Sequence, residues 1–561
     1  METIVGFATT PRTIKDTFGE YKVAKSILPD RFYTLIGEVR EGGFYPKHTY
    51  HNVFRDKIYA RSIKVRGIGS IRAISIALAF ESYEDFNSNP YSCVFHYSLD
   101  FDIVDKVALS LGFSKDAPER LTAMVVCKLM ETGSTIWTRS QIEAEVGSAL
   151  SDTLLEAMTF KPIADTPFYV LEAMREAVEV IIAKSHKIKC ITGLAGTGKT
   201  TTLVQMYNNN PGPIVAFTAK AAKRVNEVLG KDKAMTIHRF IASKPADQSV
   251  IYVDEASMVN TLLLSRMMEA SDSDSYILIG DYNQLPAIGG GNPFLDFCEV
   301  SNGHTTTLDK IWRTDSLGIL STAKGVLDGN APCDSYSDMK LGQPSYLRRV
   351  ALQNPSAIYL TFTNSQRGKI NRLIRDIVNP DNDIFSYKYR SFAMDDKVMH
   401  LKNNYDYGVF NSDMGKVTYI DKYCIGVTYA DDVLVYYVDS KYNPTINADV
   451  DGRKIAECGA GTIYKAGYRY NISTTDMVEP NMWTVDLAYC LTVHKAQGSE
   501  ADNVVICVDY SPYLTNQWLY TAITRAKVSC KLLADKRTLE AATANRDTRN
   551  TYLRHIIGNG V

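Results

Sequence analysis

The chain has 561 residues, of which 45% are hydrophobic and 22% charged, so it can bury several cores and its length predicts about three or four domains. With 62 Lys and Arg against 63 Asp and Glu, no overall field attracts a polyanion, and any nucleic-acid site must be a local groove. Ten cysteines without a CxxC pair disfavour a zinc site or a disulfide framework, and no apolar run approaches the roughly 18 residues of a membrane span. We therefore expect a cytoplasmic protein that is neither secreted nor membrane-spanning.

The first two segments of the chain differ in pattern. Residues 1–100 contain short β-rich runs such as YTLIGEV and KIYARSIKV, separated by Gly and Pro. Residues 101–167 show helical spacing of apolar residues, as in ERLTAMVVCKLMETG. We predict a β-rich accessory module followed by a helical one, which together make an N-terminal α+β accessory region.

The rest of the chain alternates between strand-like and helical stretches. In residues 168–310 the runs KCIT, PIVAFT, VIYVDE and YILIG are separated by helical patterns, which predicts an α/β domain with a parallel sheet. A second such domain is predicted over 311–395 and 481–561. Residues 396–480, between its two parts, are rich in β-branched and aromatic residues and predict an inserted small β-barrel.

The stretch GLAGTGKT, residues 193–200, has the GxxxxGK[ST] pattern between a predicted strand and a predicted helix. Its glycines let backbone N–H groups surround a phosphate, Lys199 neutralises the β- and γ-phosphates of ATP, and the Thr200 hydroxyl coordinates Mg²⁺. The alternative is a glycine-rich turn without a ligand. The predicted nucleotide contacts are Gly193, Gly196, Thr197, Gly198, Lys199, Thr200 and Thr201.

Two adjacent carboxylates, Asp254 and Glu255, follow the apolar strand VIYV. Ligands of parallel sheets bind at the C-terminal ends of the strands, so Asp254 can hold Mg²⁺ and Glu255 can polarise the attacking water. Read alone, such a pair is more often a solvated turn; beside the phosphate loop it indicates hydrolysis.

Further stretches follow in a fixed order. They are ILIGDYNQLPAIGGGNPF (277–294), IWRTD (311–315), LTVHKAQGSEADNVVI (491–506) and WLYTAITRAK (518–527), with TIHRF (236–240) and residues 395–417. Together with the phosphate loop and the acidic pair, they resemble the motif series of superfamily 1 DNA helicases, and most closely its RecD-like and Dda-like branch. The likeness covers residues 168–561 and is compatible with a phage or mobile-element origin.

The resemblance implies an α/β fold with two RecA-like P-loop NTPase domains and an inserted SH3-like β-barrel. It also implies ATP and Mg²⁺ as cofactors. Gln284 would sense the γ-phosphate, and Arg313 and Arg525 would reach it from the second α/β domain as arginine fingers. The elements that link the nucleotide and DNA sites would be Gln497, Gly498 and Glu500, with Glu500 as a ribose contact.

The resemblance implies DNA contacts of two kinds. Small polar or cationic groups suit phosphate and sugar, and aromatic side chains would stack on unpaired bases. The implied residues are Phe217, Thr218, His238, Phe240, Asn364, Arg367, Thr492 and His494. The alternatives are that Phe217 and Phe240 belong to the core and that His238 is a satisfied core histidine.

Three features differ from the family pattern. Met174 stands where an adenine-reading Gln is usual, which bears on selectivity for ATP. Phe217 replaces a proline and resembles the 3′-to-5′ branch, although TIHRF and the inserted barrel favour 5′-to-3′ movement. Residues 239–253 leave no room for the family's hairpin wedge, so we expect the N-terminal module, residues 1–160, to supply or support strand separation.

The leading interpretation is an ATP-dependent helicase or translocase that moves 5′ to 3′ on single-stranded DNA and unwinds tailed or forked duplexes. It would act as a monomer on DNA in the cytoplasm of a bacterial or phage-infected cell, in replication, recombination or repair. Replisome or recombination proteins would bind its N-terminal region. The alternatives are a remodeller of branched DNA or protein–DNA complexes and a nucleotide-gated DNA-binding module with incidental turnover; a small-molecule kinase accounts for nothing after residue 300.

Overall fold

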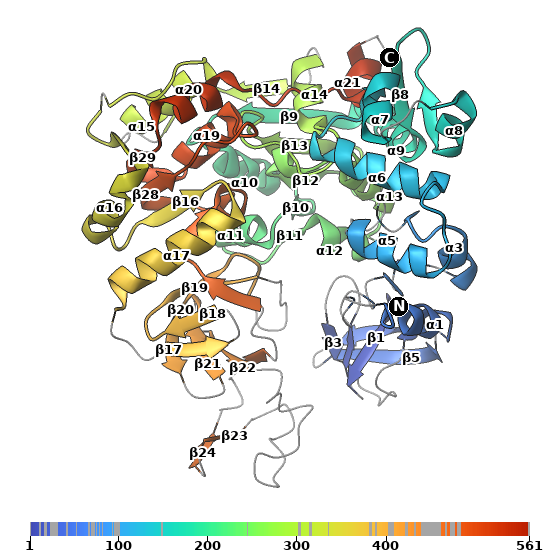
Figure 1. Ribbon diagram of the computed structural model, residues 1–561, viewed down its shortest axis with the longest axis horizontal. Coiled ribbons are helices and arrows are strands. Elements are labelled where there is room, and N and C mark those ends of the chain that lie inside the picture. Colours follow the sequence, from blue (N-terminus) through green and yellow to red (C-terminus); the bar gives the residue numbers. More distant parts are fainter. Residues whose placement is uncertain are drawn as a thin grey trace.

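A computed structural model describes most of the chain (Figure 1). For the strands before residue 52 and for β23 to β25 only the backbone is described. Outside the described residues lie 1, 11–12, 16–19, 23–31, 41–42, 52, 66–67, 69–72, 74–75, 78, 81, 93, 95–100, 147–149, 244, 301–304, 313–316, 335, 381–383, 388–389, 402–408, 421–423, 431–432, 439–461, 466–467, 472–476, 480–483 and 559–561. No helix of the described part combines the length and the apolar character that crossing a bilayer requires.

The chain begins with an antiparallel sheet of order β3-β2-β1-β4-β5. Its strands are β1 (Glu2–Thr10), β2 (Thr13–Lys15), β3 (Glu20–Lys22), β4 (Phe32–Arg40) and β5 (Gly43–His51). The strands end at His51, so the β-rich segment is about half as long as the expected residues 1–100. The run KIYARSIKV falls largely in a helix, because Phe54 and Ile58, four residues apart, pack into one apolar cluster.

Helices then form the first compact core. They are α1 (Val53–Ser62), α3 (Tyr83–Ser88), α5 (Phe101–Ser110) and α6 (Pro118–Glu131). Their shared core includes Ile58, Phe86 and Tyr91, all fully buried. Arg120 pairs with Asp105 at 2.7 Å and ties α6 to α5.

A second small unit connects these helices to the large domains. It contains β6 (Ile136–Thr138), α7 (Arg139–Val146), α8 (Asp152–Ala157), β7 (Phe160–Pro162) and β8 (Phe168–Leu171), with sheet order β6-β8-β7. Trp137 is its largest buried side chain and packs edge-on against Phe160.

The first large domain, lobe 1, has a six-stranded parallel sheet of order β11-β10-β12-β13-β9-β14. Its strands are β9 (Ile188–Gly193), β10 (Ile214–Ala216), β11 (Ala234–Thr236), β12 (Ile251–Asp254), β13 (Tyr276–Gly280) and β14 (Thr305–Leu308). Its helices are α9 (Glu172–Ala183), η1 (Ser185–Lys187), α10 (Lys199–Asn209), α11 (Ala219–Leu229), α12 (Ile237–Ala242), η2 (Ala256–Met258), α13 (Thr261–Ala270) and α14 (Pro293–Val300). The short apolar runs of the sequence form its central strands, which are buried because helices cover both faces.

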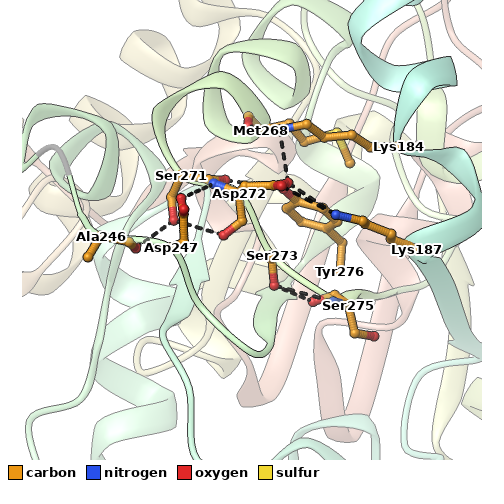
Figure 2. Close-up of polar contacts among 10 residues, drawn as sticks. All are labelled: Lys184, Lys187, Ala246, Asp247, Met268, Ser271, Asp272, Ser273, Ser275 and Tyr276. Atoms are coloured by element: carbon orange, nitrogen blue, oxygen red, sulfur yellow. Dashed lines mark hydrogen bonds and ion pairs between the residues drawn. The ribbon is translucent and has the colours of Figure 1, made fainter.

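The connection between α12 and β12 is tied to the turn that follows α13 (Figure 2). The backbone N–H of Asp272 donates to the Asp247 carboxylate at 3.0 Å. Asp272 is itself paired with Lys184 and Lys187, each at 3.3 Å. The described residues of this connection contain no hairpin, as its length predicts.

The second large domain, lobe 2, has a parallel sheet of order β15-β29-β28-β16-β27. Its strands are β15 (Met339–Gly342), β16 (Ile358–Thr361), β27 (Cys490–Thr492), β28 (Ala501–Cys507) and β29 (Ala526–Leu533). Its helices are α15 (Leu317–Leu327), η3 (Pro344–Tyr346), α16 (Leu347–Gln353), α17 (Asn364–Val378), α18 (Val493–Ala496), α19 (Asn516–Ile523) and α20 (Lys536–Ala544).

A β-rich insertion interrupts lobe 2 between α17 and β27. Its main sheet has the order β25-β22-β21-β20-β19-β26, and two hairpins, β17–β18 and β23–β24, accompany it. The strands are β17 (Ile384–Tyr387), β18 (Arg390–Ala393), β19 (Lys397–His400), β20 (Met414–Ile420), β21 (Cys424–Thr428), β22 (Leu434–Val438), β23 (Thr462–Lys465), β24 (Tyr468–Asn471), β25 (Met477–Glu479) and β26 (Val485–Leu487). The predicted α/β fold with two parallel-sheet domains and an inserted SH3-like unit is thus confirmed.

The last helix, α21 (Tyr552–Gly558), returns to lobe 1 and packs against α14 and α9. Thr551 donates to the buried carboxylate of Asp296 on α14 at 2.7 Å. The prediction that residues 481–561 all belong to lobe 2 is therefore wrong for this end, because Leu553 enters the lobe 1 core. The N-terminal sheet and the inserted barrel lie on the same side of the two lobes (Figure 1).

Candidate nucleotide and nucleic-acid site

The phosphate loop joins β9 to α10. Gly196 and Gly198 have φ values of +83° and +85°, a region that a residue with a Cβ atom adopts only at a cost. A Cβ on Gly193 would lie 2.5 Å from Thr197 Oγ1. These glycines therefore serve the curvature of the loop, which ends at the N-terminus of α10, where backbone N–H groups bind phosphate well.

The side chain of Lys199 lies along this loop. Its ammonium donates to the carbonyl oxygens of Gly193 at 2.7 Å and Leu194 at 2.9 Å. The cation is thus held at the phosphate-binding loop by groups that a stronger, charged acceptor can replace. Thr200 and Thr201 follow in the first turn of α10, Thr200 half-buried and Thr201 exposed.

The predicted acidic pair lies at the end of β12, in the same sheet. Asp254 is buried, and this burial, with the neighbouring Glu255 charge, raises the pKa of its carboxyl above the usual range. Glu255 has a φ of +51°, which costs a non-glycine residue about 1–3 kcal/mol. Outliers of this kind cluster at functional sites, which agrees with the predicted role of Glu255 in hydrolysis.

The donor set fits a magnesium nucleotide. Carboxylate and hydroxyl oxygens are the ligands that Mg²⁺ takes in phosphate sites, and Asp254 and Thr200 supply them. A divalent cation would also offset the cost of burying the Asp254 charge. The nearby charges of Arg224 and Lys199 offset that cost only in part.

The two lobes meet through hydrogen bonds beside the phosphate loop. The Tyr520 hydroxyl, on α19 of lobe 2, donates to the Asp281 carboxylate of lobe 1 at 2.7 Å and accepts from the Ala195 N–H at 3.1 Å. The Leu285 N–H donates to the Thr521 hydroxyl at 2.9 Å. Tyr520 and Asp281 are both buried, so this junction excludes water.

Gln284 and Arg525 lie close to this junction. Gln284 is buried, and its amide nitrogen is 3.5 Å from Asp281 Oδ2. Arg525 is also buried and donates to the Thr521 carbonyl at 3.0 Å. Burial lowers the pKa of Arg525, and the charge of Glu255 in lobe 1 acts in the opposite direction.

The other predicted arginine finger, Arg313, lies outside the described residues. The backbone N–H of its neighbour Trp312 donates to the Gly196 carbonyl of the phosphate loop at 2.9 Å. The chain therefore passes directly beside the loop as it leaves lobe 1.

The predicted linking element follows α18. Gly498 has a φ of +72°, and Glu500 lies 4.0 Å from Arg224 of lobe 1 and 3.9 Å from Lys527 of lobe 2. Glu500 thus bridges the two lobes electrostatically, and its contact with ribose stays a prediction. Met174 is buried in the core of the small unit before lobe 1, so its side chain does not take the place of a base-reading glutamine.

In lobe 1 the predicted DNA contacts follow β10 and β11. Thr218 caps α11 by accepting the Ala221 N–H at 3.1 Å. Phe217 and the exposed His238 lie together, with ring centroids 6.3 Å apart. Desolvation, with the Arg266 charge, lowers the pKa of His238. The prediction that Phe240 stacks on a base is wrong, because its ring is only 1% exposed in the lobe 1 core.

In lobe 2 the predicted contacts follow β16 and β27, two parallel strands whose Thr361 and Thr492 are partners. Asn364 is exposed at the start of α17, and His494 is exposed on α18. Arg367 pairs with Asp486 at 2.9 Å. In both lobes these residues lie at the C-terminal edge of the sheet.

Three features of the site were missed at the level of sequence. Tyr520 and Asp281 stand inside recognised motifs, WLYTAITRAK and GDYNQ, but their contact joins separate lobes. The third is Asp413 of the barrel. Burial raises the pKa of its carboxyl, and the charges of Lys223 and Lys220 on α11 oppose this shift. Nothing in the sequence signals that the barrel faces this helix.

Four family models match the chain. They are the AAA domain (172–341), the UvrD-like helicase C-terminal domain (487–533), the ATP-dependent RecD-like DNA helicase SH3 domain (370–430) and the ATP-dependent RecD2 DNA helicase HHH domain (62–135). The HHH match overlaps α1 to α6, a region outside the likeness over residues 168–561 that the sequence motifs carry.

Curated relatives agree with these matches. The ATP-dependent RecD2 DNA helicase of Deinococcus radiodurans is 27% identical over 404 residues, which are 66% of this chain and 50% of that protein. The RecBCD enzyme subunit RecD of Mycobacterium tuberculosis is 24% identical over 460 residues, 68% of this chain and 72% of that protein. The chain spans about half the length of the Deinococcus relative.

Solved structures of Pif1 helicases also match. The Candida albicans enzyme has a TM-score of 0.40 at 18% identity, covering 66% of this chain and 96% of that one. The Bacteroides enzyme bound to single-stranded DNA has a TM-score of 0.39 at 16% identity, covering 69% and 95%. The family models and the curated relatives together confirm the predicted resemblance of this chain to the RecD-like helicases of superfamily 1.

Proposed function

We propose that the protein is an ATP-dependent DNA helicase that moves along single-stranded DNA and separates duplexes. The observation that carries this proposal is the pair of hydrogen bonds by which the Tyr520 hydroxyl of lobe 2 joins Asp281 and the phosphate-loop residue Ala195 of lobe 1. A nucleotide bound there contacts both lobes, so its hydrolysis changes how they fit together.

The residues divide the work as follows. Lys199 and the loop N–H groups bind the phosphates, Thr200 and Asp254 hold Mg²⁺, and Glu255 accepts a proton from the attacking water. Bound Mg²⁺ neutralises charge on the phosphate oxygens. Gln284 orients the water, and Arg525 offsets the charge that develops during transfer.

The DNA strand crosses the C-terminal edges of both sheets. Thr218 and His238 in lobe 1, and Asn364, Thr492 and His494 in lobe 2, lie at these edges and suit contacts to phosphate and sugar. Such contacts read no sequence. We propose movement from 5′ to 3′, with the N-terminal region supporting strand separation, since the short connection before β12 holds no hairpin in its described residues.

The alternatives make different use of the same site. A remodeller of branched DNA would act on junctions without processive unwinding, and a nucleotide-gated binding module would turn over ATP only incidentally. The presence of Glu255, Gln284 and Arg525 together favours hydrolysis as the purpose of the site. We further propose that the protein acts as a monomer on cytoplasmic DNA in replication, recombination or repair, and that replisome or recombination proteins bind its N-terminal region.

The test is ATP turnover with and without single-stranded DNA, followed by unwinding of duplexes that carry a 5′ tail, a 3′ tail or a fork. We expect stimulation by DNA, loss of turnover in Lys199→Ala, and unwinding of 5′-tailed but not 3′-tailed substrate. The proposal of a DNA-dependent ATPase is contradicted if DNA does not change the rate of ATP turnover and Lys199→Ala retains that rate. Activity on forks alone favours the remodeller.

A further inference from the structure

The lobe 2 sheet places five loops in a row at its C-terminal edge. Because all its strands are parallel, the loops that follow β27, β16, β28, β29 and β15 lie side by side in this order. The first two carry the predicted DNA contacts Thr492 and Asn364. The other three, at residues 508–515, 534–537 and 343–346, have no role in the proposed mechanism.

The loops after β28 and β15 expose tyrosines, and arginines lie beside two of these rings. Tyr513 is 79% exposed and Tyr510 is 51% exposed, with the guanidinium carbon of Arg537 5.0 Å from the Tyr510 ring centroid. Tyr346 is 43% exposed, with the guanidinium carbon of Arg349 4.4 Å from its ring centroid. Large exposed aromatic rings that sit on a rigid edge with arginines are the parts from which single-strand sites are built.

The loop with two tyrosines is fixed in place and continuous with the predicted DNA contacts. Gln366, two residues after Asn364, donates to the Asp509 carboxylate at 3.0 Å. Asn545 donates to the carbonyls of Pro512 at 3.1 Å and Leu514 at 2.9 Å. The backbone that carries the rings is therefore already ordered, which lowers the entropic cost of binding.

The arginines of this edge can donate to phosphate, although the edge carries charges of both signs. Its exposed cations are Arg348, Arg349, Lys536 and Arg537. Glu540 pairs with Lys536 at 3.6 Å, and the other carboxylates of this edge are Asp509, which accepts from Gln366, and Asp535, which accepts the Thr538 N–H at 2.7 Å. A hollow of about 510 Å³ between Tyr346 and Lys536 lies in the same row.

We propose that Tyr510, Tyr513 and Tyr346, with Arg537 and Arg349, form a base-stacking track that extends the single-stranded DNA site across lobe 2. The track rests on the proposed function, because it continues the strand's path from Asn364. It binds unpaired bases of any sequence through ring stacking and binds the backbone through the arginines.

The test measures the affinity of the full-length protein for fluorescent oligothymidylates of about 8 to about 16 nucleotides, a span chosen from known single-strand site sizes. The variants are the double substitutions Tyr510→Ala with Tyr513→Ala and, as the conservative pair, Tyr510→Phe with Tyr513→Phe. The matched control is Tyr336→Ala, an exposed tyrosine before β15, at the opposite edge of the same sheet.

We expect the alanine pair to weaken binding of the longest oligothymidylate by about fivefold or more, with little change for the shortest, since stacking contributes about 1–3 kcal/mol per base. The phenylalanine pair and Tyr336→Ala should bind like wild type. A wild type that binds no oligothymidylate refutes the proposed function itself. A wild type that binds well, with an alanine pair that matches it at every length, overturns the track and leaves this surface to a protein partner. Equal weakening at all lengths also overturns it, because the tyrosines would then lie within the motor's own footprint.

Discussion

Replacing Tyr520 with Phe removes one hydroxyl from the junction between the lobes. That hydroxyl donates to Asp281 at 2.7 Å and accepts from Ala195 at 3.1 Å. Without it the fully buried Asp281 carboxylate keeps only the long contact from Gln284 on that oxygen. A buried polar group left without its partner costs about 1–3 kcal/mol. Because both bonds join the two lobes, this cost destabilises the arrangement in which the lobes are in contact. We take the cost as about 2 kcal/mol.

That value predicts a decrease of about 30-fold in kcat/KM for ATP in the presence of saturating single-stranded DNA. The matched control is Tyr252→Phe, which removes an equally buried hydroxyl whose bonds, to the carbonyls of Met206 and Asn210, stay within lobe 1. The control should lose stability in thermal unfolding but keep its kcat/KM. Wild-type kcat/KM in Tyr520→Phe would refute the reasoning that this junction forms part of the catalytic closure.

Three further predictions concern lobe 1 and its partner arginine. Arg525→Ala should reduce ATP turnover by about 10³-fold or more while equilibrium titration still shows nucleotide binding; near-normal turnover would exclude a catalytic arginine at this position. Phe240→Ala should lower the free energy of unfolding in urea by about 3–5 kcal/mol, and unchanged stability with weaker DNA binding would restore its role in stacking. Burial raises the pKa of Asp296 to about 7, whereas the unfolded chain has a value of about 3.9. The folded state therefore holds a proton that the unfolded state loses above about pH 4. The free energy of unfolding falls as pH rises from about 4 towards 7, by up to about 1.4 kcal/mol per pH unit. Asp296→Asn should flatten that part of the curve in pH-dependent urea unfolding. Asp296 pairs with Arg554 at 3.1 Å, and an unaltered slope would mean that this pair keeps Asp296 ionised throughout.

The arrangement of the candidate nucleotide site could be predicted because its residues are close in the chain, while their contacts with a nucleotide stay predictions. Gly193 to Thr200 are consecutive, and Asp254 and Glu255 end one apolar strand, so spacing alone indicates their roles. The two-lobed architecture followed from the alternation of short apolar runs with helical stretches. These patterns depend only on neighbours in the chain.

Contacts between distant segments could not be predicted in the same way. Phe240 stands in the motif TIHRF, which does not reveal which face of a short helix enters the core. The N-terminal boundary failed because KIYARSIKV is β-rich in composition, while the spacing of Phe54 and Ile58 decides for a helix. Tyr520 and Asp281 are 239 residues apart, and only the packing of the lobes brings them together.

The return of α21 to lobe 1 means that the polypeptide passes between the lobes twice, once after β14 and once after α20. Two connecting segments at separate points allow one lobe to rotate about the line that joins these points. They oppose translation of one lobe against the other and rotation about other axes. Proteolytic cleavage at one passage alone would leave both halves held by the other.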